Sequence, residues 1–188
     1  MFEWIKGLRK AAAPVRRVRS RDDGADAERV ELAEFAPGIL PFLGLTAYLQ
    51  LEMYEAATRG VSGAATLQAK DVLARVAGQT LSKHQRLTAE LRKRGEEPHI
   101  VMAPFARVID EYVERIETSD WHQHVLSLYL VGGLFDDFFA TLAGGLRDSY
   151  RTEAISILRD DTGRDELKAL LEEALAADEA LSSWLALW

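Results

Sequence analysis

The chain has 188 residues, enough for one domain with a substantial hydrophobic core. It contains no cysteine, which excludes disulfides, thiolate metal sites and a cysteine nucleophile and fits a reducing, cytoplasmic compartment. No apolar run reaches the roughly 18 residues that a membrane span needs, so we expect a soluble protein.

The net charge of −7 hides two regions of opposite sign. Residues 1–21 hold seven basic side chains and one acidic one, and the remainder carries a net charge of −13. Within MFEWIKGLRK, apolar residues recur at helical spacing beside basic ones, which predicts an amphipathic helix for a membrane surface or a partner's groove. Its predicted contact residues are Phe2, Trp4, Ile5, Lys6, Leu8, Arg9 and Lys10. The alternative is a solvated arm that folds back on the acidic body.

Beyond a polar linker, the pattern predicts only helices. The expected segments are 41–60, 64–94, 104–117 with Pro104 in the first turn, 121–142 after a Ser-Asp cap, and 146–188 as one helix interrupted at Gly163 or as two. Alternating strand patterns and hairpin dipeptides are absent from the sequence. The predicted class is therefore all-α, with a basic N-terminal arm and linker over residues 1–36 and a helical bundle over residues 37–188.

Each long segment has an apolar stripe at helical spacing, and polar residues interrupt these stripes. Glu52 falls on the first stripe, His84 with Leu81 on the second, Gly132 on the third, and Asp161 with Arg164 on the fourth. Four such stripes predict an antiparallel bundle with knobs-into-holes packing.

Four stretches resemble the ferritin-like proteins of actinobacteria, which are themselves similar to the di-iron hydroxylase of 2-methylthio-isopentenyladenosine in tRNA. The stretches are LTAYLQLEMYEAATRG, LSKHQRLTAELRKRG, FARVIDEYVERIETSDW and LVGGLFDDFFATLA, and the resemblance covers roughly Pro41 to Glu173. It implies a ferritin-like antiparallel four-helix bundle with additional short helices. In di-iron proteins of this type, two helices each supply a Glu and the other two each supply a Glu-x-x-His pair.

Compared with that pattern, three ligand positions are lost, at Leu81, Gly132 and Arg164. Glu52, His84 and Asp161 remain as vestigial ligands or, with Arg164, as a buried polar cluster. Gln50 and Glu55 are alternatives to Glu52 for the ligand position of the first helix. Asp136 is a possible alternative ligand. A guanidinium is always protonated and cannot coordinate a metal, so we expect Arg164 to neutralise Glu52 or Asp161.

Each of these residues also has an ordinary structural explanation. His84 is then a core histidine with a satisfied hydrogen bond. Gly163 can end a helix and leave Arg164 exposed. His122 and His124 are interpreted as surface residues.

These losses favour a non-catalytic ferritin-like bundle that acts as an interaction or structural subunit, with no catalytic residue, metal or cofactor expected. Its partner is a protein, a second copy or a ligand-complete ferritin-like relative, and the C-terminal SSWLALW must be buried in the core or against that partner. The alternative is an iron-dependent, tRNA-modifying hydroxylase in which Glu52, His84, Asp161 and Asp136 hold one iron. Nucleic acid is expected only under this alternative, because an acidic body repels phosphates.

Overall fold

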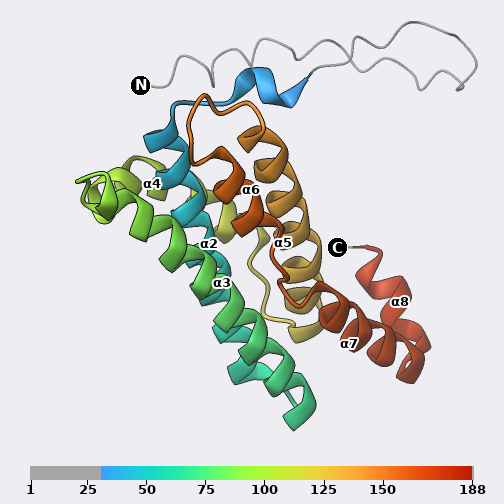
Figure 1. Cartoon of the computed structure of the whole chain (residues 1–188). Coiled ribbons are helices and arrows are strands. Elements are labelled where there is room, and N and C mark those ends of the chain that lie inside the picture. Colours follow the sequence, from blue (N-terminus) through green and yellow to red (C-terminus); the bar gives the residue numbers. More distant parts are fainter. Residues whose placement is uncertain (1–30, 188) are drawn as a thin grey trace, which may run out of the picture. The chain divides into compact units, whose positions relative to one another are not determined.

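The computed structural model describes residues 31–187, and every regular element in that range is helical (Figure 1). This confirms the all-α prediction. The elements are the 3-10 helix η1 (Leu32–Phe35) and the α-helices α2 (Ile39–Gly63), α3 (Leu67–Lys93), α4 (Pro98–Ile116), α5 (Trp121–Ala143), α6 (Arg151–Arg159), α7 (Arg164–Ala177) and α8 (Glu179–Leu185). The proposed arm residues from Phe2 to Lys10, and Trp188, lie outside the described residues.

Helices α2, α3 and α5 and the broken helix α6–α7 form a four-helix bundle in which neighbours run antiparallel. In each pair of neighbours, a residue later in one helix contacts a residue earlier in the other. Between α2 and α3 the contacts are Ala47 with His84 and Gly60 with Leu73, and between α2 and α5 they are Gln50 with Asp136 and Gly60 with Trp121. Between α3 and α6–α7 they are Arg86 with Glu153 and Arg75 with Glu166. The fourth position of the bundle is therefore filled by two helices in succession.

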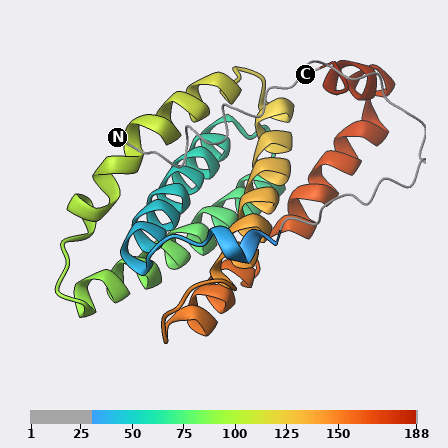
Figure 2. The ribbon, with the colours of Figure 1, turned by 90° about the horizontal axis from the view of Figure 1, so that it is seen from above.

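Helix α4 lies outside this bundle, runs parallel to α2 and packs mainly on it (Figure 2), and its Tyr112 ring also lies 5.6 Å from the Phe135 ring of α5. Near its start, Val101 approaches Gly44 so closely that a Cβ on the glycine would lie 2.5 Å from the Val101 carbonyl oxygen. Further along, the Tyr48 hydroxyl donates to Asp110 Oδ1 at 2.6 Å. Helix α4 thus carries the chain from the end of α3 back to the start of α5, as the single long crossover of ferritin-like bundles requires.

The predicted start of α4 at Pro104 was wrong, because the helix begins at Pro98 and Pro104 lies inside it. A proline is tolerated in the first turn, where its missing N–H has no helical partner, so Pro98 suits the observed start. The cap prediction for α5 is confirmed, since the Asp120 carboxylate accepts from the Gln123 N–H at 2.9 Å.

Helix α5 is long and apolar enough to cross a membrane by length and composition alone, which corrects the expectation that the chain has no such segment. Its most apolar stretch has a mean hydropathy of 1.5 and is 39 % buried inside the protein. The same helix carries Asp136, whose side chain pairs with Lys83 inside the bundle. A central helix of a soluble bundle has this character, which makes the membrane signal weak.

Hydrophobic clusters occupy both ends of the bundle and leave a polar layer between them. One cluster includes Leu73, Val76, Val125 and Leu128, and the other includes Phe42, Leu49, Phe139 and Leu142. The buried polar residues between these clusters are Gln50 on α2 and Thr80 and Lys83 on α3, and the Asp136 side chain of α5, 13 % exposed, lies with them.

The end of the chain is only partly buried. Leu185 is 8 % exposed, whereas Trp184 and Leu187 are 40 % and 88 % exposed. Helix α8 packs mainly on α7. The expectation of burial in the chain's own core thus holds for Leu185 but not for Trp184 or Leu187.

Candidate functional site

The polar layer centres on a buried ion pair between Lys83 and Asp136. Lys83 is 2 % exposed, and its Nζ donates to Asp136 Oδ2 at 2.8 Å and to the Leu158 carbonyl at 3.0 Å. Gln50, also 2 % exposed, donates from Nε2 to Asp136 Oδ1 at 2.8 Å. Both oxygens of the carboxylate are therefore held by side chains from α2 and α3, and the ammonium also bonds to the backbone of α6.

Beside the ion pair lies a small cavity of about 20 Å³, lined in part by Gln50, Thr80 and Asp136. Gln50 Oε1 points to no donor among the described residues. The Thr80 hydroxyl donates to its own helix, to the carbonyls of Val76 and Ala77. The cavity has room for about one water, and its lining offers both acceptors, on Gln50 and Asp136, and a donor, the guanidinium of Arg164.

Burial dominates the electrostatics of Asp136 and raises the pKa of its carboxyl above the ordinary value. The Lys83 ammonium and the hydrogen bonds from Lys83 and Gln50 act in the opposite direction, and Asp137 adds to the increase. The ammonium is thus the main counter-charge of a carboxylate that has little water around it.

Sequence reasoning missed Lys83, although its position follows from spacing. The buried residues Leu73, Val76, Thr80, Lys83 and Leu87 step by three and four, as core positions of a bundled helix do. A lysine in such a series is easily assigned to solvent because lysine is almost never fully buried without a partner. The partner, Asp136, lies 53 residues away and cannot be inferred from the pattern of α3 alone.

His84 and Leu81 were expected on the apolar stripe of α3 that faces the centre of the bundle. The buried positions are instead Thr80 and Lys83, each one residue earlier in the chain. His84 and Leu81 are both half-buried. The His84 Nδ1 lies 2.8 Å from the Ala47 carbonyl oxygen, and because a carbonyl only accepts, Nδ1 carries the proton. His84 therefore forms an ordinary helix–helix hydrogen bond between α3 and α2.

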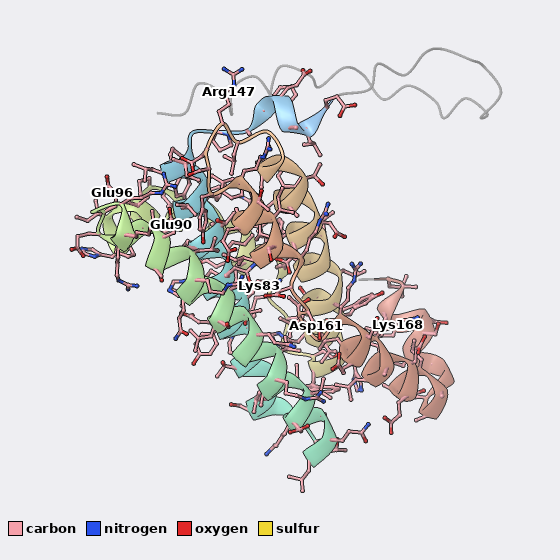
Figure 3. All side chains as sticks on the ribbon, viewed as in Figure 1. Lys83, Glu90, Glu96, Arg147, Asp161 and Lys168 are labelled. Carbon is pink, nitrogen blue, oxygen red and sulfur yellow. The ribbon has the colours of Figure 1, made fainter. Side chains whose placement is uncertain are left out.

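Arg164 and Asp161 lie where α6 ends and α7 begins, and Figure 3 shows Asp161 at this junction. Gly163, with a φ of +68°, turns the chain there. Asp161 accepts from the Gly163 N–H at 2.9 Å, as a turn residue does. The expected pairing of Arg164 with Glu52 or Asp161 was wrong: its side chain, 48 % exposed, lies 3.4 Å from Asp137 and 5.4 Å from the ring centre of Tyr129.

Glu52 faces α4 instead of the central layer. Burial raises the pKa of its carboxyl, and the charges of Glu55 and Asp110 act in the same direction, while a hydrogen bond with Tyr48 acts against them. The residue of α2 that reaches the centre is Gln50, which the sequence offered as an alternative to Glu52. Gly132 lies beside Met53, so close that a Cβ on the glycine would lie 2.8 Å from the Met53 Cε.

The four predicted site residues, Glu52, His84, Asp161 and Arg164, are therefore not brought together, and Asp136 alone of the possible ligands reaches the centre. No group of three or more His, Cys, Asp or Glu side chains in the described part of the chain has the geometry of a metal site. A di-iron centre needs several carboxylates and neutral imidazoles, whereas the central layer offers one carboxylate that is already paired with a lysine. The side chains present do not fit such a centre.

A family model described as a ferritin-like domain of actinomycetes matches residues 33–188. A search of curated proteins gave no match. The match covers the crossover helix and all four sides of the bundle.

Proposed function

The chain belongs to the ferritin-like domain family of actinomycetes, and we propose that it is a non-catalytic member that acts as an interaction or structural subunit. The observation that supports this most strongly is the Lys83 ammonium, 2.8 Å from Asp136 Oδ2 in the centre of the bundle. An ammonium there supplies the positive charge that metal ions supply in di-iron relatives of this fold.

The inward-facing positions support the same interpretation. Thr80 and Lys83 are three residues apart on α3, the spacing of a Glu-x-x-His pair. On α6, Ala154 and Ile157 have the same spacing and are fully buried. The two single-Glu positions correspond to Gln50 on α2 and Asp136 on α5. One carboxylate of the ferritin-like ligand set is retained, and we infer that the site lost its metal ligands.

The competing proposal is an iron-dependent hydroxylase with a rearranged site of Glu52, His84, Asp136 and Asp161. It requires these side chains to approach one another. Glu52 faces α4, His84 bonds the backbone of α2, and Asp161 serves a turn. A tRNA substrate rests on family resemblance alone.

The proposed partner is a protein: a second copy, a ligand-complete relative, or a protein that binds the basic N-terminal arm. The alternative contact of the arm is a membrane surface. We place the protein in the cytoplasm because the chain has no cysteine. Deleting residues 1–21 is expected to abolish attachment through the arm, and unchanged binding of that variant would contradict this part of the proposal.

Iron content after expression with added iron, followed by anaerobic titration with ferrous ion, tests the proposal. We expect no stoichiometric iron and no change in the thermal midpoint. One or two irons per chain would contradict the proposal and favour the hydroxylase.

A matched variant checks whether the layer occupies the position of a metal site. The triple substitution Gln50→Glu, Thr80→Glu and Lys83→His places a Glu-x-x-His pair and a second Glu beside Asp136. We expect this variant to take up iron that the natural chain does not. His84→Ala is the matched control and is expected to lose some stability but to leave iron content unchanged.

A further inference from the structure

A groove lies between α2, α4 and α5, on the face where the crossover helix passes the bundle. Its floor is mainly apolar and includes Met53, Ile116, Leu128, Val131 and Phe135. On α4 and α5, two of the helices that form the groove, Val108 and Leu134 are 49 % and 62 % exposed. Apolar side chains that line a groove and others that lie exposed on the helices beside it indicate an interaction site.

The rim of the groove is acidic. Glu52 and Glu117 line it, and the raised pKa of the Glu52 carboxyl reflects burial together with the nearby charges of Glu55 and Asp110. Arg59 is the only arginine or lysine among the lining residues, and it already pairs with Glu55 at 3.9 Å. The negative charge at the rim thus exceeds the positive charge that the chain itself provides there.

His124 and Tyr48 do not remove this excess. The Nε2 of His124 lies 2.7 Å from the Ala56 carbonyl oxygen and so carries a proton that it donates to the backbone; the histidine lines the groove instead of lying at the surface as expected. The Tyr48 hydroxyl donates to Asp110, and burial and the neighbouring carboxylates raise the pKa of that hydroxyl, which keeps it neutral.

We propose that this groove binds a cationic amphipathic helix of a partner protein, whose apolar face covers the floor and whose lysines or arginines meet Glu52 and Glu117. The inference rests on the proposed interaction role and names its surface and the chemistry of its partner. A helix is the expected form of the partner because it presents apolar and cationic side chains side by side, as in other helix-in-groove complexes, and so matches the apolar and acidic lining that α2, α4 and α5 supply. The folded body of a second copy would bring like charge, since residues 31–188 contain 15 basic and 25 acidic residues, a net charge of −10. An anionic membrane is repelled for the same reason.

The test uses the full chain and a fluorescent synthetic peptide of about 14 residues, four helical turns, with leucine and lysine at amphipathic spacing. Binding is followed by fluorescence anisotropy. The double substitution Glu52→Gln and Glu117→Gln is expected to weaken binding about tenfold, and Val131→Ser about threefold. The matched control, Asp71→Asn with Glu172→Gln, removes the same charge from exposed positions on α3 and α7 and is expected to change affinity by less than about twofold.

The possible results separate the hypotheses. Loss of binding in the groove variants alone supports the proposal, and circular dichroism of each variant checks that it is folded. Equal loss in the control variant, no effect of the groove variants, or no peptide binding at all overturns it. Binding to anionic phospholipid vesicles that the groove variants abolish also overturns it and assigns the face to a membrane. Because iron content is a separate measurement, an iron-free chain that binds no peptide overturns the groove and leaves the non-catalytic proposal standing.

Discussion

The central layer and the groove both contain carboxylates removed from bulk water, but only the central layer supplies a full counter-charge. Asp136 accepts from Lys83 and Gln50 inside the bundle, whereas Glu52 in the groove faces Glu55 and Asp110. A charge in the core is neutralised within the chain because an unpaired buried ion lowers the free energy of unfolding. Charge at a groove can remain uncompensated and so be available to a partner.

Removing the lysine is expected to have the largest effect on this comparison. Lys83→Met leaves Asp136 buried without its counter-charge, and we expect a loss of about 3–5 kcal/mol in the free energy of unfolding. Lys83→Met combined with Asp136→Leu removes both charges and is expected to recover most of that loss. Urea denaturation of the two single variants and the double variant measures the coupling. Additive losses would show that the two residues are not coupled.

The pH dependence of stability separates Asp136 from a carboxylate at the end of the bundle. The Arg94 guanidinium, 2.8 Å from Asp148, lowers the pKa of the Asp148 carboxyl, so its contribution is present above the ordinary Asp pKa and is lost as pH falls through the lowered value. Burial raises the pKa of Asp136, so its contribution falls as pH rises from the ordinary to the raised value.

Urea denaturation between about pH 3 and pH 7 measures both contributions. The difference in stability between the natural chain and Asp148→Asn is expected to grow with pH. The corresponding difference for Asp136→Asn is expected to shrink with pH above the ordinary Asp pKa. Two slopes of the same sign would contradict the assigned environments.

In the groove, Glu52→Gln is expected to stabilise the free protein. The raised pKa of Glu52 means that its ionised form is disfavoured on folding, and a neutral amide removes this penalty. We expect a gain of about 0.5 kcal/mol near pH 7 that disappears below the ordinary pKa of glutamate. A loss of stability at neutral pH would show that Glu52 is well paired in the free chain.

The smallest expected effect is that of Arg164→Ala. Arg164 is half-exposed and makes one long ion pair with Asp137 and a contact with the ring of Tyr129. We expect a loss of about 0.5 kcal/mol or less in the free energy of unfolding, because solvent screens exposed pairs. A loss similar to that of Lys83→Met would place Arg164 in the central layer after all.

Local sequence signals predict the helices of this protein better than the residues of its central layer. The four long helical segments, the Asp120 cap and the break at Gly163 follow from local signals and were predicted, whereas the start of α4 at Pro98 and the break at Asp178 between α7 and α8 were not. The site residues were selected by chemical type, so His84 was preferred to Lys83. Periodicity alone favours Thr80 and Lys83 because they continue the series of Leu73 and Val76. Consecutive residues of a helix point about 100° apart, so an assignment that is wrong by one residue selects side chains beside the core face instead of those on it.

The sequence by itself determined the helical class, the order of the main helical segments along the chain and the excess of negative charge over residues 22–188, because these depend on local periodicity and on composition. Only the tertiary structure decided which polar residues reach the centre. The Lys83–Asp136 pair joins positions 53 apart on two helices, and the groove joins residues of α2, α4 and α5. The environment of a charge is set by the distances and burial that packing creates, and no local pattern encodes these.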